Sequence, residues 1–75
     1  MIDIPLVRID GQKVRTARDA KGISRERLAA RIGVSTKTIE RVETDQGDVA
    51  AGTAYLIAAE LEVDLASLFT EEPVA

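Results

Sequence analysis

The chain of 75 residues has room for one small domain with a single core, and its lack of cysteine and histidine excludes disulfide scaffolds, zinc fingers and catalysis by thiol or imidazole groups. Hydrophobic residues make up 45% of the chain but aromatic ones only 3%, so the core must consist of aliphatic side chains, as is typical of a helical domain. The net charge of −3 is unevenly distributed, because all ten basic residues lie between Arg8 and Arg41 whereas residues 42–75 hold eight acidic residues and no basic one.

The start of the chain predicts an extended arm followed by a helix. Residues 4–9 are short, rich in β-branched side chains and interrupted by Pro5, which favours an edge strand over a helix. Asp10 is a suitable N-cap for a helix over residues 11–21, and Gly22 is suited to end that helix in a left-handed conformation. The first ten residues are therefore expected to be an arm that precedes the folded domain.

The middle of the chain predicts two short helices joined by a tight turn. Ser24 is placed to cap a helix over residues 25–32, and Ser35 to cap a second helix over residues 36–44. Gly33 lies at the start of the turn, where a positive φ or a close approach is needed. Because the link has only three or four residues, the helices must cross at about 90–120°, which is helix-turn-helix geometry.

The last third of the chain predicts one helix with a weak beginning and one short helix. Residues 44–48 form a turn by composition, and Ala50 is a poor cap for the helix expected over residues 51–62. Asp64 is expected to cap a final helix over residues 65–69. No apolar run approaches the roughly 18 residues of a membrane span and no signal-peptide pattern is present, so we expect a cytoplasmic protein. The predicted organisation is an arm, a domain and a flexible tail, at residues 1–10, 11–69 and 70–75.

The stretch KGISRERLAARIGVSTKTIERVE, followed by LIAAELEVDLASLF, resembles the Cro/cI (lambda-repressor-like, XRE-type) family of helix-turn-helix DNA-binding domains. The resemblance covers roughly residues 12–69. It implies an all-α bundle of five helices, here preceded by the short extended arm. It also implies that the third helix reads the major groove of double-stranded DNA, usually as part of a homodimer on a two-fold operator.

The resemblance further implies which residues contact DNA. Those that face base edges would belong to the cap and the first turns of the third helix, namely Ser35, Thr36, Lys37, Thr38 and Arg41. The side-chain chemistry agrees, because lysine and arginine donate to guanine and threonine offers a hydroxyl or a methyl contact to thymine. The residues expected at the DNA backbone are Ser24 and Arg25, at a helix N-terminus that attracts anions, and Arg15.

Alternatives stay open for several charged residues. Solvation rather than DNA contact is the competing interpretation for Arg15, Arg27 and Arg31. Glu40 has three possibilities: it pairs with Lys37, it accepts from the N4 amine of cytosine, or it faces away from DNA. The division of charge along the chain is itself open to two interpretations, an anionic partner for the basic half or two sets of helices solvated by opposite charges.

Two further features follow from the resemblance. Arg18 and Glu43 match positions that form a partly buried ion pair in the family, and they are expected to lock the first helix to the third. Residues 44–49 are acidic where many members carry a basic loop that contacts the DNA backbone. We therefore expect backbone contacts to come from the side of residues 8–31 or from loop amides.

The function expected from these residues is sequence-specific regulation of transcription. The protein would be a repressor or Cro-like switch of a phage or plasmid, or the controller of a restriction–modification or toxin–antitoxin operon. A homodimer is expected because one recognition helix reads only a few base pairs. Its contact would come either from the arm pairing with a second copy or from apolar residues near the C-terminus, and an arm packed on its own domain is an equal alternative. Those C-terminal residues are Leu56, Leu65, Leu68 and Phe69, of which Phe69 is expected to close the core.

A second function class is a protein-interaction module of the same fold that docks through the acidic residues 42–75. An enzyme is not expected, because the carboxylates lie at helix ends and caps, as on solvated surfaces. The sequence predicts no catalytic residue, no metal ligand set, no cofactor and no small-molecule ligand.

Overall fold

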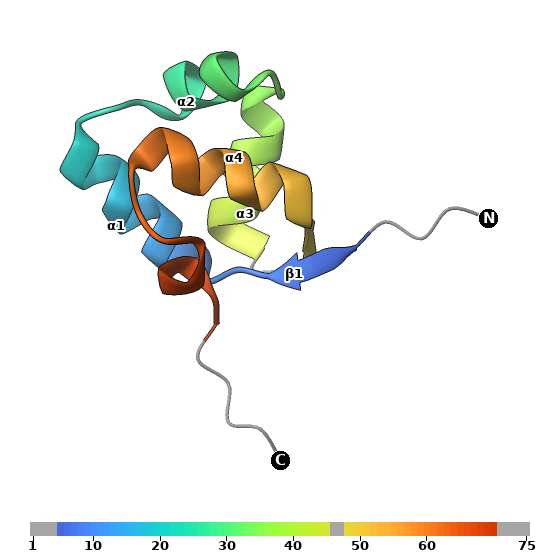
Figure 1. The fold of residues 1–75 in the computed structure, drawn as a ribbon. Helices are drawn as coiled ribbons and strands as arrows, with labels where there is room; N and C mark the ends of the chain where they lie inside the picture. Colours follow the sequence, from blue (N-terminus) through green and yellow to red (C-terminus); the bar gives the residue numbers. More distant parts are fainter. Residues whose placement is uncertain (1–4, 46–47, 71–75) are drawn as a thin grey trace.

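The computed structural model describes residues 5–45 and 48–70, with the side chains of Asp45 and Asp48 left out. In these ranges the fold is mostly helical, with four α-helices, one short 3₁₀ turn and a two-stranded antiparallel sheet (Figure 1). In chain order the elements are β1 (Leu6–Arg8), α1 (Gly11–Lys21), α2 (Arg25–Ile32), α3 (Thr36–Asp45), β2 (Asp48–Ala50), α4 (Ala51–Leu61) and η1 (Leu65–Leu68).

The first three helices begin at the residues that local sequence signals predict; α1 and α2 also end there, whereas α3 ends at Asp45, one residue later than predicted. The N-caps each accept a hydrogen bond from a backbone N–H two or three residues later, at 2.9 Å for Asp10, 3.0 Å for Ser24 and 3.2 Å for Ser35. Gly22 and Gly33 adopt the left-handed conformation at the ends of α1 and α2, with φ of 70° and 80°. These caps satisfy backbone groups that a helix end leaves without intrahelical partners.

The prediction of a fifth helix is wrong. Residues 65–68 form a 3₁₀ turn, and the side chain of Asp64 accepts no capping hydrogen bond. A segment this short cannot offset the nucleation cost of an α-helix, so it adopts the tighter one-turn form. The expectation that Phe69 closes the core is also wrong, because Leu68 is buried at 2% exposure while Phe69 is only partly buried.

Helix α4 lacks side-chain caps at its start and a glycine at its end. Ala50 makes no side-chain cap, as expected, but the N–H of Ala51 donates to the carbonyl of Pro5 at 2.9 Å. The helix ends at Leu61, one residue earlier than predicted, and Glu62 takes the left-handed C-cap position with φ of 59°. The arm thus stabilises the start of α4. At the other end of the helix, Glu62 adopts a left-handed conformation that is less favourable for glutamate than for glycine.

The arm packs on its own domain. Strand β1 pairs with β2 in antiparallel register, with Leu6 opposite Ala50 and Arg8 opposite Asp48. Ile9 forms a further antiparallel bridge with Phe69, next to η1. Sequence reasoning missed β2, since residues 44–48 have the composition of a turn; residues 46–47 of that segment lie outside the described ranges, as do residues 1–4 of the arm and 71–75 of the expected tail.

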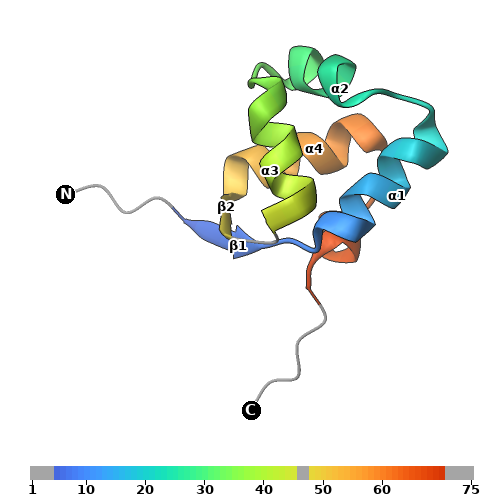
Figure 2. The same cartoon turned by 180° about the vertical axis from the view of Figure 1, so that it is seen from behind.

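The core is a single aliphatic cluster to which every helix contributes. Among the described residues it consists of Ile9, Val14, Leu28, Ala29, Ile39, Val42, Ala54, Ile57, Ala58, Leu61 and Leu68. Helix α3 packs against both α1 and α2, and α4 packs against α2 on the other side of the core (Figure 2). This arrangement holds α3 at the surface of the bundle while its inner side is fully covered.

The start of α1 lies against the end of α3 without room for a side chain. A Cβ atom placed on Gly11 would lie 2.6 Å from the carbonyl oxygen of Val42 and would also clash with the backbone of Glu43. Contacts this short between a Cβ and backbone atoms do not occur in folded proteins. Glycine is therefore required at position 11 by close packing between two helices.

Candidate nucleic-acid interface

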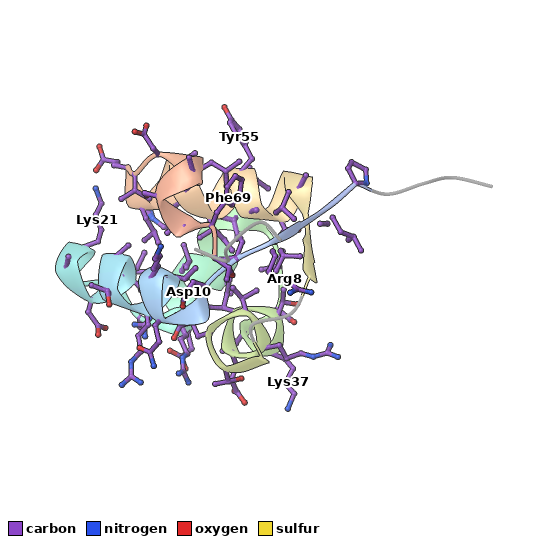
Figure 3. All side chains as sticks on the ribbon, turned by 90° about the horizontal axis from the view of Figure 1, so that it is seen from below. Arg8, Asp10, Lys21, Lys37, Tyr55 and Phe69 are labelled. Carbon is purple, nitrogen blue, oxygen red and sulfur yellow. The ribbon has the colours of Figure 1, made fainter. Side chains whose placement is uncertain are left out.

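Helix α3 presents one face to the core and another to solvent. Ile39 is fully buried and Val42 is 6% exposed, whereas Lys37 and Arg41, one helical turn apart, are exposed. Figure 3 shows Lys37 projecting from α3 away from the body of the domain, on the side opposite to Tyr55 of α4. The outer face of α3 is therefore a cationic surface supported from behind by α1 and α2.

Lys37 and Arg41 are available to a partner. Within the described ranges neither side chain takes part in a hydrogen bond or an ion pair. The pairing of Glu40 with Lys37 is likewise not among the ion pairs of these residues. Two cationic side chains, of the types that can donate to guanine, thus lie on one exposed helix face without a competing acceptor among the described residues.

The hydroxyl groups at the start of α3 are partly committed. The Ser35 hydroxyl accepts from the N–H of Thr38 and lies 3.0 Å from the hydroxyl oxygen of Thr38, in a second hydrogen bond. Thr36 is half-buried and has no such partner among the described residues. Of the predicted base-contacting set, Lys37, Arg41 and Thr36 therefore have their polar groups uncommitted, while Ser35 and Thr38 hold the cap.

The structure brings Arg18 and Glu43 together in a buried ion pair. Nε of Arg18 lies 2.6 Å from Oε2 of Glu43, and Nη2 of Arg18 donates to Oε1 at 3.2 Å. The Glu43 side chain is fully buried and that of Arg18 is 11% exposed. A third hydrogen bond, from Nη1 of Arg18 to the carbonyl of Ile23, anchors the guanidinium to the loop before α2.

Arg25 joins the same carboxylate, which sequence reasoning missed. Its Nε donates to Oε1 of Glu43 at 3.0 Å, so that α1, α2 and α3 each contribute one residue to a cluster of two guanidinium groups around one carboxylate. Nothing in the spacing of positions 18, 25 and 43 signals this meeting, because it depends on how three helices cross. Arg25 was expected only at the DNA backbone.

The cluster shifts the pKa values of Glu43 and Arg18. Burial raises the pKa of Glu43, but the hydrogen bonds and charges of Arg18 and Arg25 together outweigh it and leave the pKa below its ordinary value. The hydrogen bond to Glu43 raises the pKa of Arg18 against the opposing effect of burial. Glu43 is therefore ionised, and the cluster carries its full complement of charges at neutral pH.

The remaining predicted cations divide into paired and exposed ones. Arg31 pairs with Glu60 at 2.8 Å and Lys21 pairs with Glu62, so both bind α4. Arg15 and Arg27 are exposed on α1 and α2. The described ranges contain no cluster of carboxylates that would hold a metal ion, and no helix in them is long and apolar enough to cross a membrane.

A family model described as helix-turn-helix, HTH_3, matches residues 14–68. The chain belongs to this family. The match begins within α1 and spans α2, α3, α4 and η1, and it includes every residue of the Arg18–Arg25–Glu43 cluster. The family consists of DNA-binding regulators, which confirms the expectation that the chain is not an enzyme.

Solved structures and curated proteins agree with the family. The restriction-modification controller protein C.AhdI from Aeromonas hydrophila superposes with a TM-score of 0.73 and 34% identity over 79% of this chain and 89% of that one. The master regulator for biofilm formation SinR, solved in complex with DNA, gives a TM-score of 0.72 and 26% identity over 76% of this chain and 95% of that one.

The curated relatives are longer than this chain. An uncharacterized transcriptional regulator in the ATPase CF(0) region of Rhodospirillum rubrum is 38% identical over 61 residues, which is 81% of this chain and 56% of that protein. A putative HTH-type transcriptional regulatory protein of Pyrococcus furiosus is 42% identical over 48 residues, 64% of this chain but only 15% of that protein. This chain therefore spans only part of the length of each of these relatives.

Proposed function

We propose that the protein is a sequence-specific, double-stranded-DNA-binding regulator of transcription that inserts α3 into the major groove. The observation that carries the proposal is the position of Lys37 and Arg41. Both are exposed and uncommitted on the outer face of a helix whose inner residues, Ile39 and Val42, lock it to α1 and α2. Binding in the major groove requires a helix that is held in place by the domain and that carries hydrogen-bond donors on its exposed face.

The relatives support this proposal. C.AhdI is a controller of a restriction–modification system and SinR is a regulator solved with DNA bound, and this chain spans nearly the whole length of both solved chains. We propose that the chain acts in the cytoplasm as a compact controller of this kind, either as a repressor or as a Cro-like switch. A separate sensing domain is not needed for that role.

The decisive test uses double-stranded fragments selected from random DNA by the wild-type chain. We expect selection to converge on a sequence, and the variant carrying both Lys37→Ala and Arg41→Ala to bind that fragment at least about 30-fold more weakly, because each bidentate base contact is worth about 1–3 kcal/mol. Lys21→Ala is the matched control, since Lys21 lies at the far end of α1 and pairs with Glu62 (Figure 3). A double variant that binds as tightly as the wild type would contradict the proposal.

The salt dependence of binding tests the contribution of the DNA backbone. If the dimer neutralises about six phosphates, log K falls against log salt concentration with a slope of about −5. The proposed contacts are Arg15 and Arg25, with Ser24 at the cap of α2. An affinity that does not change with salt would exclude this mode of binding.

We further propose that the protein binds DNA as a homodimer. Two recognition helices about 34 Å apart read successive turns of the same face of DNA, which one small domain cannot do. The candidate contact surface consists of the large apolar side chains that remain exposed in the described ranges, Leu6 at 58%, Tyr55 at 63% and Leu56 at 43%. None of these side chains belongs to α3, so a contact through them leaves the Lys37 and Arg41 face free, and the dimer must place both α3 helices on the same side of the pair to read one face of DNA.

Sedimentation of the protein tests the dimer. We expect a dimer at micromolar concentration and a shift towards monomer for Tyr55→Glu, which places a charge in the proposed contact without touching the core. A sedimentation coefficient of a monomer for the wild type, both alone and with DNA, would rule the dimer out.

Docking through an acidic surface is the alternative with less support. Of the four acidic residues of the C-terminal half whose side chains are described, Glu43 is buried, Glu60 and Glu62 are paired with Arg31 and Lys21, and Asp64 is exposed. Three of these four side chains are thus engaged by basic residues of the same chain. The uneven charge distribution along the sequence serves in part to hold α4 to α1 and α2.

A further inference from the structure

We propose that Glu43 positions Arg25 to bind a DNA phosphate at the N-terminus of α2, so that a fully buried carboxylate contributes to DNA binding through a partly exposed arginine. The inference rests on the proposed function and deepens it. It assigns to Glu43 a second role, as a positioning residue, beside its ion pair with Arg18. It also separates Arg25 from Arg15 and Arg27, which have no carboxylate partner among the described residues.

In the Arg25 side chain, Nε is bonded to Glu43, whereas the two terminal nitrogens are available to a ligand. Its Nε donates to Oε1 of Glu43 at 3.0 Å, and its side chain is 32% exposed. Among the described residues Arg25 makes no other side-chain hydrogen bond. A guanidinium has five N–H donors in a planar fork, so the bond from Nε leaves the two terminal nitrogens to donate to an outside acceptor.

Charge in the cluster favours an anion at Arg25. Arg18 is the stronger partner of Glu43, with two hydrogen bonds to it, and it lies 3.5 Å from Asp19 on its outer side. Arg25 has only one bond to a carboxylate that is already shared. The shared carboxylate of Glu43 therefore only partly neutralises the charge of Arg25, while the hydrogen bond to Glu43 fixes the position of the guanidinium.

The position of Arg25 in the helix adds to this preference. Arg25 is the first residue of α2, after the N-cap Ser24, whose hydroxyl accepts from the N–H of Arg27. The first turn of a helix carries unpaired N–H groups and the positive end of the helix dipole, both of which attract phosphate. A guanidinium fixed beside this turn by Glu43 binds phosphate without first losing the rotational freedom of a long side chain, because that freedom is already lost on folding.

A double-mutant cycle between Arg25→Ala and Glu43→Gln tests the coupling. The probe is the fragment that the wild-type chain selects from random DNA, and melting temperatures are measured for the same four proteins. We expect Arg25→Ala to weaken binding at least about tenfold, as for loss of a charge-assisted hydrogen bond. Glu43→Gln should weaken binding several-fold in the presence of Arg25 and have no further effect in its absence, although it lowers the melting temperature in both backgrounds.

Two outcomes of the cycle would overturn the inference. If Glu43 acted only through its negative charge, Glu43→Gln would strengthen DNA binding in both backgrounds, because a charge that repels phosphate is removed. If it acted only through folding, the losses of the two substitutions would add. A wild-type chain that selects no fragment would instead remove the proposed function itself, which is a separate result.

A second variant keeps the test independent of the stability of the Glu43→Gln protein. Arg25→Lys retains the charge, but a single ammonium nitrogen cannot reproduce the fork that reaches Glu43 and a phosphate together. We expect it to weaken binding about fivefold or more with a nearly unchanged melting temperature. Arg27→Lys is the matched control, an exposed arginine of the same helix with no carboxylate partner among the described residues, and it should bind as the wild type does. Equal affinity of the Arg25→Lys variant and the wild type would overturn the inference.

Discussion

The two halves of the domain, the helix-turn-helix half (α1 to α3) and the closing half (α4 with η1), differ in the hydrogen bonds that stabilise their helix ends. Helices α1 to α3 begin at residues whose side chains cap them, and α1 and α2 end at left-handed glycines. By contrast, α4 and η1 have no side-chain caps, and α4 ends at a left-handed glutamate. Backbone hydrogen bonds from distant segments compensate, including those from Ala51 to Pro5 and from Asp10 to Leu68.

This difference shows which half is specified locally. The helix-turn-helix part is defined by short-range signals, because the ends of α1 and α2 and the start of α3 are set by neighbouring residues. The closing half depends on contacts between the two ends of the chain, which form only when the whole domain is folded. Changes in the two halves should therefore affect stability in different ways, and the following substitutions, from the largest expected effect to the smallest, test that view.

Arg18→Ala should have the largest effect on stability. It leaves the buried Glu43 carboxylate with Arg25 as its only partner in the cluster, and breaking one side of a buried ion pair costs about 3–5 kcal/mol. Urea unfolding measures the loss. Arg15→Ala, an exposed position of the same helix, should change the free energy of unfolding by less than about 0.5 kcal/mol. Similar stabilities for the two variants would show that the cluster does not support the helix-turn-helix half.

Gly11→Ala should cost about 1–3 kcal/mol, because the added methyl group must displace the backbone at the end of α3. Gly52→Ala is the matched control in α4. No atom lies within 4 Å of the position a Cβ would take there, so alanine should raise stability by about 0.5–1 kcal/mol through its higher helix propensity. Thermal unfolding of both variants measures these changes. A neutral Gly11→Ala would mean that α1 and α3 are not in close backbone contact.

The pH dependence of stability isolates the Glu43 cluster. The pKa of Glu43 is lower in the folded protein than in the unfolded chain, so its contribution is fully present above the unfolded value of about 4.3 and is lost as pH falls through the folded value. We expect the free energy of unfolding of the wild type to approach that of Glu43→Gln as pH is lowered from 7 to 3. Other carboxylates titrate in both proteins and cancel in the difference. A difference that stays constant over this range would argue against the ion pair.

Glu62→Gly should have the smallest effect and the opposite sign. Glycine adopts the left-handed conformation at the end of α4 without strain, which favours a gain of about 1 kcal/mol, reduced slightly by loss of the surface ion pair with Lys21. Glu62→Ala is the control, since it removes the same ion pair and keeps the strained conformation. If the glycine variant melted no higher than the alanine variant, the end of α4 would not be a weak point of the closing half.

The parts of the fold that could be predicted are those with signals in neighbouring residues. Asp10, Ser24 and Gly33 mark helix ends because each acts on backbone groups within a few residues of itself. Strand β2 could not be predicted in this way, because its partner lies more than 40 residues earlier and its own composition resembles a turn. The choice of Leu68 over Phe69 as the buried residue likewise depends on the bridge between Ile9 and Phe69.

The candidate site shows the same division. The exposure of Lys37 and Arg41 follows from the spacing of Ile39 and Val42 along one helix, which is a local pattern. The hydrogen bond between Ser35 and Thr38 is also local: the sequence predicts Ser35 both as the cap of α3 and as a base contact, and the structure confirms the cap. The bond between Arg25 and Glu43 arises only from the crossing of two helices and has no local signal.

The bridge between Ile9 and Phe69 has a practical consequence. It places the first and the last segments of the described fold side by side, and the Thr70 N–H also donates a hydrogen bond to the Arg8 carbonyl. A unit built in this way tolerates insertion into a surface loop of a host polypeptide, and it tolerates a short peptide that joins its ends while new ends are opened elsewhere.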